Sequence, residues 1–407
     1  MVFKCQEDSF LKEFTTTVID CTKAKFSTVI NGKKEKIDGF EIVCEDTILF
    51  PEGGGQPSDQ GFLNNVQVYQ VNRRGDKAVH YTKNELSIGE SVKQIVDWKR
   101  RLDHMQQHSG QHLLTAIIDR EFKFSTVSWW LGEEISHIEL DTSSISKEQI
   151  EKAEYLCNEL IRDAKPVNVE LLKLNENTDV NQIRARGLPK DHVGDVRIIT
   201  IENVESNMCC GTHVSNLAQL QVIKLLNVEK SSRKNNVLLN FLVGNRVLEK
   251  LGSCLEREQK LITILNNAPS QHFDLVEKLV KTTKILSKNQ QSLLKDIAVY
   301  EVEKLKGLDQ LPKYFMVHRK EGDFDFMNQF IKLINSTDIF LVLSIGEEKG
   351  SGNIVLYGKE DVIADLGPKI CQILNGKGAG KGNKYQGKVN NLGNLHLVED
   401  LLKSYFK

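Results

Sequence analysis

No long apolar run occurs in this sequence, which argues against a protein that crosses a membrane. A membrane-spanning helix needs about 20 uninterrupted apolar residues, and no window of the 407-residue chain approaches that length. The first residues, Met1 to Asp8, lack the apolar stretch of a secretory signal and already carry acidic side chains. We therefore expect a cytoplasmic protein that makes no membrane contact.

The sequence also lacks a large excess of charge of one sign and a dense set of cysteines. Its formal net charge of −1 gives no general attraction to nucleic acid, so any RNA contact must come from local basic patches. Eight cysteines are scattered along a long chain, which argues against a disulfide framework. Only the adjacent pair Cys209 and Cys210 has a context that suggests chemistry.

The composition is that of a folded protein, with 40% hydrophobic and 27% charged residues, and the patterning predicts an α+β multidomain chain. Residues 1–98 hold short β-branched or aromatic runs between turn-forming residues, which favours a small β-barrel. Residues 99–245 mix amphipathic helices with separated strands, as in an α+β layer domain. Residues 246–307 break only at Pro269-Ser270, which predicts a helical hairpin or coiled-coil arm whose second helix Ser270 caps. Residues 308–407 predict a compact α/β domain, and the helical arm offers a surface for self-association.

Two short segments carry the strongest chemical signal. His108-Ser-Gly-Gln-His112 opens an apolar helical run, and residues four apart on a helix share one face. Cys209-Cys-Gly-Thr-His213 follows a strand-like run, with Gly211 allowing a tight bend. Nitrogen and sulfur donors of this kind suit Zn²⁺, so the two pairs together predict a zinc site.

The spacing leaves the ligand choice open at two positions. His104 continues the four-residue spacing of the histidines, and Cys210 competes with Cys209, although Cys209 has the better spacing to His213. The residues between His108 and His112 do not include the glutamate of the H-E-x-x-H zinc proteases. We therefore expect hydrolysis of a labile ester rather than of a peptide bond.

At this point the sequence resembles a known family. The two ligand pairs resemble the editing-domain signature of alanyl-tRNA synthetases and of the free-standing alanyl-tRNA editing (AlaX) proteins. Leu49-Phe-Pro-Glu-Gly-Gly-Gly-Gln-Pro-Ser-Asp-Gln-Gly61 is similar to the glycine-rich segment of the family's N-terminal barrel. Gly187-Leu-Pro189 and the run Asn207–Val214 also fit the family pattern. The resemblance covers essentially the whole chain and points to the long form of the free-standing protein.

The resemblance implies one zinc ion per chain, bound by His108, His112, Cys209 and His213. It also implies hydrolysis of tRNA(Ala) that carries serine or glycine by mistake. The family commonly has glycine where this chain has Cys210, which leaves the ligand spacing intact but exposes a neighbouring thiol to oxidation. Because 98 residues before the editing domain leave no room for a synthetase core, we expect editing without tRNA charging.

The logic of editing adds two candidate residues. A synthetase pocket sized for alanine excludes neither glycine nor serine cleanly, so a second site must hydrolyse the wrong esters. That site has to recognise the serine hydroxyl if alanine is to be spared. Thr126 and Ser128, after the histidine-bearing helix, are our candidates for this contact, and each is equally compatible with an ordinary strand hydroxyl.

Two further segments are candidates for RNA contacts. Gly53-Gly54-Gly55 lacks the Lys-Ser/Thr of a phosphate-binding P-loop, and predicts either a structural turn or a tight loop near the editing pocket or the tRNA acceptor end. Residues 375–388 resemble the glycine-rich loop of the C-terminal domain of alanyl-tRNA synthetases. The RNA-binding candidates on this flexible loop are Lys377, Lys381, Lys384, Tyr385 and Lys388. Mobile lysines can follow phosphates, and a tyrosine can stack on an unpaired base. Lys99-Arg100-Arg101 offers a second basic patch.

Two rival functions stay open from the sequence. Four protein ligands around zinc also fit a closed structural site, so the chain could be a zinc-stabilised RNA- or protein-binding module without turnover. A small-molecule metallohydrolase is disfavoured by the basic C-terminal segment, for which such an enzyme has no need.

Overall fold

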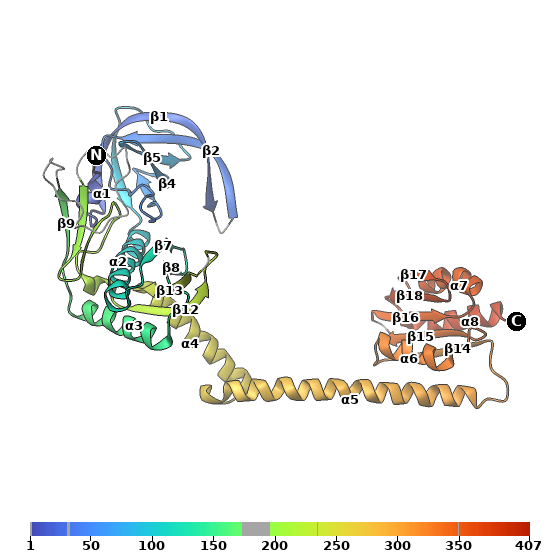
Figure 1. Cartoon of the computed structure of the whole chain (residues 1–407). Helices are drawn as coiled ribbons and strands as arrows, with labels where there is room; N and C mark the ends of the chain where they lie inside the picture. Colours follow the sequence, from blue (N-terminus) through green and yellow to red (C-terminus); the bar gives the residue numbers. More distant parts are fainter. Residues whose placement is uncertain (1, 31–32, 173–195, 234, 349) are drawn as a thin grey trace. The chain divides into compact units, whose positions relative to one another are not determined.

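The computed structural model describes residues 2–30, 33–172, 196–233, 235–348 and 350–407. Within these residues it contains eight α-helices and four β-sheets, so the protein is of mixed α+β character (Figure 1). The chain divides into two compact units, Met1–Gln259 and Lys260–Lys407. Across the described part of the chain, no helix has both the length and the apolar character that crossing a bilayer requires.

Six strands of the first unit close into a barrel in the order β1-β2-β5-β4-β3-β6. They are β1 (Glu13–Ile30), β2 (Lys33–Cys44), β3 (Gly61–Leu63), β4 (Val66–Arg74), β5 (Lys77–Thr82) and β6 (Ser91–Val96). The strands differ widely in length, from 3 residues in β3 to 18 in β1, and closure of the barrel removes unpaired sheet edges. A short helix, α1 (Lys4–Glu7), precedes the barrel. The domain boundaries expected at residues 98 and 245 stay predictions, because residues 1–98 and 99–245 both lie within the first compact unit.

A long helix follows the barrel and packs in the core of the remaining part of the first unit. Helix α2 (Trp98–Phe122) begins at Asp97, whose side chain accepts a hydrogen bond from the backbone N–H of Arg100. It ends at Lys123, which adopts the left-handed conformation. Helix α3 (Lys147–Arg162) starts with a reciprocal capping box between Ser146 and Gln149. Both helices therefore begin where local side chains satisfy free backbone N–H groups.

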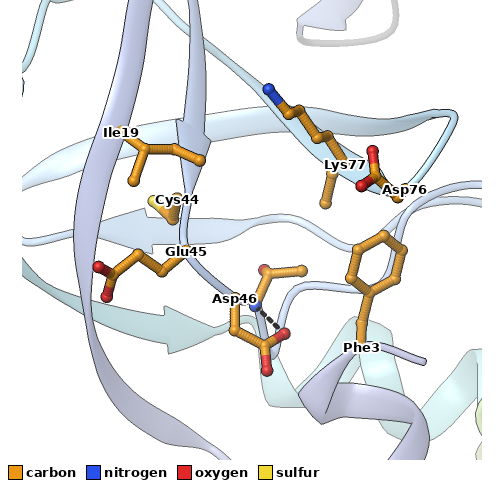
Figure 2. A pocket seen from close by; sticks show the side chains of 9 residues that line it. Phe3, Ile19, Cys44, Glu45, Asp46, Asp76 and Lys77 are labelled. Carbon is orange, nitrogen blue, oxygen red and sulfur yellow. Dashed lines mark hydrogen bonds between the residues drawn. The ribbon is translucent and has the colours of Figure 1, made fainter. Parts of the chain in front are cut away.

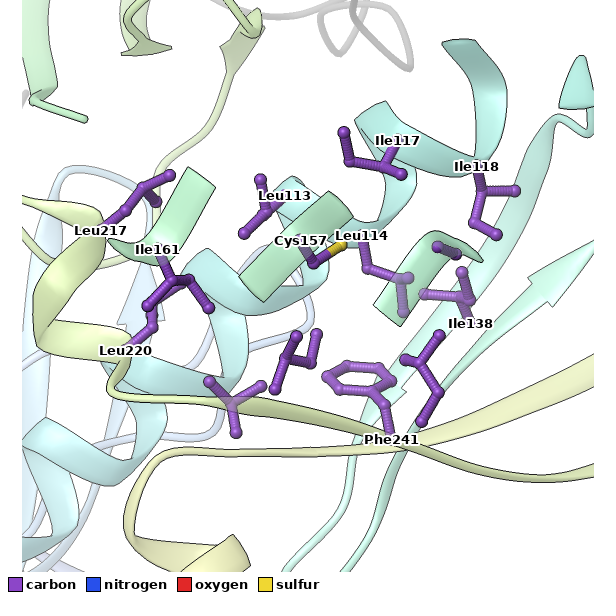
Figure 3. Packing of buried hydrophobic residues seen from close by; sticks show 14 of the residues in the cluster. Leu113, Leu114, Ile117, Ile118, Ile138, Cys157, Ile161, Leu217, Leu220 and Phe241 are labelled. Atoms are coloured by element: carbon purple, nitrogen blue, oxygen red, sulfur yellow. The ribbon is translucent and has the colours of Figure 1, made fainter. Parts of the chain in front are cut away.

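Two further sheets belong to the same part of the first unit. The four-stranded sheet β12-β13-β8-β7 consists of β7 (Thr126–Leu131), β8 (Ser136–Leu140), β12 (Ile223–Lys230) and β13 (Val237–Val243). The three-stranded sheet β11-β10-β9 consists of β9 (Val167–Leu172), β10 (Val196–Ile201) and β11 (Glu205–Met208). Figure 3 shows Leu114 of α2, Cys157 of α3 and Phe241 of β13 in one buried apolar cluster. This cluster fixes α2 against the sheet and thereby sets the position of the residues that the helix carries.

The helical segment contains α4 (Asn245–Leu265), a 3-10 turn (Pro269–Gln271) and α5 (His272–Lys306). The capping role predicted for Ser270 is wrong, because Ser270 lies inside the 3-10 turn and Gln271, which precedes α5, makes no side-chain cap bond. Near the end of α5, Leu294, Ala298 and Val302 are buried. They belong to an apolar cluster that also contains residues of α6.

The second unit contains the five-stranded sheet β14-β15-β16-β18-β17. Its elements are β14 (Tyr314–Arg319), α6 (Phe324–Ile334), β15 (Phe340–Gly346), β16 (Gly352–Tyr357), α7 (Glu360–Ile373), β17 (Lys377–Lys381), β18 (Lys384–Val389) and α8 (Leu395–Tyr405). Strands β14 and β15 are parallel, and the other pairs are antiparallel. Alternate residues of β15 face opposite sides: Val342 packs with α7 and α8, whereas Leu341 and Leu343 pack with α5 and α6.

Candidate metal centre

Four side chains from distant parts of the sequence converge in the first unit. They are His108, His112, Cys209 and His213, hereafter the metal cluster. One potential ligand atom from each lies within 4.8 Å of all the others. The three histidines are buried and Cys209 is half-buried. The two sequence segments predicted to share one ion therefore come together around one point.

Helix α2 and the loop after β11 supply two members each. Unlike an ordinary surface helix, α2 is buried along most of its length and carries buried glutamine, serine and histidine side chains. Gly110, between the two histidines, lets α2 approach β13, because a Cβ there would lie 2.5 Å from Val243. Gly211 has a related role, since a Cβ at that position would collide with the His108 ring. A residue with a side chain at position 211 would therefore displace the His108 ring.

Each histidine of the cluster has a polar neighbour at its Nδ1 atom. His108 Nδ1 lies 2.9 Å from Gln56 Oε1, and His213 Nδ1 lies 3.0 Å from Ser109 Oγ. His112 Nδ1 lies 3.3 Å from the amide of Asn207 and 3.8 Å from Glu205 Oε1. Partners at Nδ1 orient an imidazole so that Nε2 can bind a metal.

The Nε2 atoms of His108 and His213 lie close to the thiol of Cys209. Cys209 Sγ lies 3.5 Å from His108 Nε2 and 3.3 Å from His213 Nε2. Three imidazoles and one thiol arranged in this way form a donor set that suits Zn²⁺. Gln56, Ser109 and Glu205 could not be predicted as partners from the sequence, because their contacts with the histidines depend on tertiary structure.

Burial controls the charge of the cluster. It lowers the pKa of His108 and His213 well below the usual 6.5, and the neighbouring histidines and Arg197 lower these pKa values further. Burial and the charge of Arg197 also lower the pKa of His112, to about 4. The three imidazoles are therefore neutral near pH 7, with lone pairs available for a metal. Burial raises the pKa of the Cys209 thiol to about 12, and a bound divalent cation favours its deprotonation.

The loop that carries Cys209 and His213 is held from two other elements. Arg197 of β10 donates hydrogen bonds to the carbonyl oxygens of Cys209 at 2.9 Å and Gly211 at 2.7 Å. Gln6 of α1 donates to the carbonyl oxygen of Cys210 at 2.7 Å. Arg197 is only 6% exposed, so these are bonds from a buried cation to the backbone. They fix the course of the loop independently of any bound ion.

The alternative ligands His104 and Cys210 do not belong to the metal cluster. Cys210 instead faces the glycine-rich loop, since a Cβ at Gly54 would lie 3.0 Å from its Sγ. Gly54 and Gly55 have φ values of +61° and +80°, a conformation that glycine adopts readily. A Cβ at Gly55 would collide with Trp129. This loop is therefore packed against the ligand loop and β7.

The two predicted serine-recognition residues lie in different surroundings. Thr126 Oγ1 lies 3.3 Å from the hydroxyl of Thr115, three residues after His112 on α2. Ser128 donates a hydrogen bond to Glu139. A β-bulge between Thr126 and Ser128 puts the two side chains on opposite faces of the sheet, where Thr126 pairs with Leu140 and Ser128 with Glu139. The hydroxyl of Thr126 thus lies beside α2 and that of Ser128 beside Glu139, and serine recognition stays a prediction for both. Gly187-Leu-Pro189 lies outside the described residues.

The glycine-rich segment near the C-terminus is a β-hairpin of β17 and β18, which corrects the prediction of a flexible loop. Its register pairs Lys377 with Lys388 and Lys381 with Lys384. Because paired and alternate residues share a face, the four lysines lie on one side of the hairpin. Lys384 also donates a 2.6 Å hydrogen bond to Asn328 of α6.

The opposite side of the hairpin carries Tyr385, which is only 8% exposed. Cβ atoms at Gly367, Gly378 and Gly380 would lie 2.6, 2.6 and 2.7 Å from its ring. The glycines thus make room for a buried aromatic ring, and the stacking of Tyr385 on an RNA base is not supported. The sequence did not reveal this, because Gly367 lies outside the glycine-rich segment. Arg101, expected in a second basic patch, is also fully buried.

A hollow of about 140 Å³ lies on the barrel, away from these residues (Figure 2). Phe3, Cys44, Asp46 and Lys77 are among the residues that line it. None of the predicted metal, serine-recognition or RNA-binding residues takes part. The hollow therefore does not contribute to the candidate metal centre.

Comparison with known proteins gives matches over nearly the full length. Residues 196–239 match the family described as "Threonyl and Alanyl tRNA synthetase second additional domain". Alanyl-tRNA editing protein Aarsd1 from Mus musculus is 47% identical over 406 residues, which cover 100% of this chain and 98% of that protein. The putative alanyl-tRNA editing protein alaX from Saccharomyces cerevisiae is 31% identical and covers 97% and 94%. AlaX-L from Pyrococcus horikoshii is 26% identical and covers 94% and 93%.

Proposed function

Since the chain belongs to the alanyl-tRNA editing protein family, we propose that it deacylates tRNA(Ala) that carries serine or glycine, using a zinc ion. The observation that carries the proposal is the metal cluster, whose ligand atoms lie within 4.8 Å of one another. The neutral state of its buried imidazoles supports metal binding, because a protonated imidazole has no free lone pair. The proposal assigns one zinc ion to each chain.

Different residues have different roles in the proposed reaction. The metal cluster holds the ion, while Gln56, Ser109 and Glu205 lie beside the three imidazoles. When bound, zinc supplies Lewis-acid chemistry for the cleavage of an ester. Arg197 keeps the ligand loop in place through its backbone hydrogen bonds. These contacts support a preorganised site for the ester of a mischarged tRNA.

Selection of serine over alanine requires a contact with the serine hydroxyl. We assign this contact to Thr126, whose hydroxyl lies next to α2 and Thr115. Ser128 is the second candidate, although its hydroxyl already donates to Glu139. A site built to bind a hydroxyl can reject an analogue without it by about 10⁴-fold. The Thr126→Val variant should therefore lose activity on the serine ester without gaining activity on the alanine ester.

The lysine face of the β17–β18 hairpin is the proposed RNA contact in the second unit. Lys377, Lys381 and Lys388 are exposed on it, and Lys384 is partly covered. Lysines on one face of an edge hairpin can neutralise several phosphates together. Tyr385 is not part of this contact, because its ring is buried.

The decisive experiment follows release of free amino acid from Ser-tRNA(Ala) and Ala-tRNA(Ala). The full chain is compared with the double variant His108→Ala/His112→Ala and with His104→Gln, a control on the same helix but outside the metal cluster. We expect loss of the serine ester with the alanine ester spared, and loss of this activity only in the double variant. Intact esters despite bound zinc would contradict editing and favour the rival function, a zinc-stabilised binding module.

A further inference from the structure

Gln56 of the barrel unit reaches into the metal centre. It lies between β2 and β3 in the sequence and is 0% exposed. Its Oε1 atom lies 2.9 Å from His108 Nδ1 and 3.0 Å from the backbone nitrogen of Thr212. Its Nε2 atom donates a 2.7 Å hydrogen bond to Thr212 Oγ1. One amide group therefore connects the barrel to both halves of the metal cluster.

These contacts determine which nitrogen of His108 carries the proton. The backbone N–H of Thr212 can only donate, so the atom that faces it must be the amide oxygen of Gln56. The same oxygen faces His108 Nδ1, which must therefore be the protonated nitrogen. The lone pair of His108 is then on Nε2, the atom that lies 3.5 Å from Cys209 Sγ. This is the tautomer that metal binding through Nε2 requires.

The backbone around Gln56 is shaped to hold the amide in place. The backbone groups of Gly53 and Gln56 form two mutual hydrogen bonds, of 3.2 and 3.1 Å. Gly54 and Gly55 complete the turn with positive φ values. Gly211 leaves space for this contact, because a Cβ there would lie 2.4 Å from His108 Nδ1 and 2.8 Å from Gln56 Oε1. The glycine-rich loop thus positions an amide rather than a phosphate.

We propose that Gln56 is a positioning residue of the metal centre, through which the barrel sets the tautomer of His108 and the course of the ligand loop. The barrel then belongs to the metal-binding machinery. The inference rests on the metal site of the proposed function and extends it to a residue outside the cluster. Loss of such a partner lowers metal affinity by about 10- to 100-fold.

Cobalt binding tests this inference without the editing reaction. The full chain is titrated with Co²⁺ against a competing chelator, and the dissociation constant and the visible absorption spectrum are recorded. Gln56→Met keeps the volume but removes the polar atoms, whereas Gln56→Glu keeps an acceptor for His108 and Thr212. Gln60→Met is the matched control, because Gln60 lies on the same segment and donates to the carbonyl oxygen of Tyr69 at 3.1 Å, not to the cluster.

We expect Gln56→Met to weaken Co²⁺ binding about 10- to 100-fold and to alter the spectrum. Gln56→Glu should restore much of the affinity, and Gln60→Met should match the unaltered chain. Equal affinities of Gln56→Met and the unaltered chain would overturn the inference alone. Equal losses in Gln56→Met and Gln60→Met would also overturn it, because they would reflect a damaged barrel. Failure of the unaltered chain to bind Co²⁺ would overturn the proposed metal centre itself and the inference with it.

Discussion

Replacement of Arg101 by methionine should strongly destabilise the first unit. The guanidinium of Arg101 is fully buried, and its Nε donates a 2.9 Å hydrogen bond to Asp59 Oδ2. It also donates to the carbonyl oxygens of Ser9 at 2.8 Å and Ile48 at 2.5 Å. Arg101 thus ties α2, which carries two members of the metal cluster, to the barrel and to the N-terminal segment.

The expected cost follows from the partner that is left behind. Asp59 is 0% exposed, so the Arg101→Met variant contains a buried carboxylate without its cation. Such a change costs about 3–5 kcal/mol, a large part of the roughly 5–15 kcal/mol by which domains are usually stable. With a urea dependence of about 3 kcal/mol per molar, the unfolding midpoint should fall by about 1–2 M.

Urea unfolding followed by tryptophan fluorescence is the suitable assay. All three tryptophans, Trp98, Trp129 and Trp130, lie in the first unit, so the signal reports on that unit alone. Arg100→Met is the control, because Arg100 is only half-buried and its Nε donates to a carbonyl oxygen, that of Ser58. We expect a loss below about 1 kcal/mol for it.

A second variant tests the electrostatic cause. Asp59→Asn removes the negative charge, and its amide oxygen can still accept the 2.7 Å hydrogen bond from the backbone nitrogen of Phe50. Arg101→Met/Asp59→Asn should therefore be more stable than Arg101→Met alone, by about 1–3 kcal/mol. A double variant no more stable than Arg101→Met, or a loss below about 1 kcal/mol for Arg101→Met, would refute the reasoning.

Four further predictions concern other parts of the chain. Burial raises the pKa of Glu139, but hydrogen bonds from Ser128, Ser231 and Asn236 and the charge of Arg233 outweigh burial and bring the pKa to about 2. Glu139 thus adds stability that is complete above pH 4.5 and is lost as the pH falls toward 2, so Glu139→Gln should flatten the acid side of a stability–pH curve. Gly378→Ala should lower the melting temperature of the second unit in circular dichroism, at a cost of about 1–3 kcal/mol, with no change in tryptophan fluorescence. The triple variant Lys377→Ala/Lys381→Ala/Lys388→Ala should weaken tRNA binding and reduce the slope of log affinity against log salt by about 2 to 3; an unchanged slope would exclude this face. Leu286→Lys should weaken self-association in sedimentation equilibrium, since Leu286 is 61% exposed and lies seven residues from the exposed Leu279 and Leu293; an unchanged association constant would exclude this face of the arm.

The sequence predicted the four members of the metal cluster better than their surroundings. Two histidines four residues apart lie on one helix face whatever the rest of the fold does, so local periodicity was sufficient. The contact between Gln56 and Thr212 spans 156 residues, and no local pattern encodes it. The hairpin at residues 377–389 was missed for another reason. Its alternate glycines give no polar–apolar alternation, and their role depends on the ring of Tyr385 and on α7.

The metal centre brings together segments that lie far apart along the chain. Gln6 contacts the ligand loop across 204 residues, and Gln56 contacts it across 156. Because of thermodynamic linkage, a side-chain contact that strengthens metal binding is itself strengthened by the bound metal to the same extent. If Gln56 strengthens metal binding about 10- to 100-fold, bound metal stabilises the docked arrangement of the glycine-rich loop by the same factor. Metal loss should therefore loosen the barrel loop, and hydrogen exchange at Gly53–Gln56 should rise when the ion is removed.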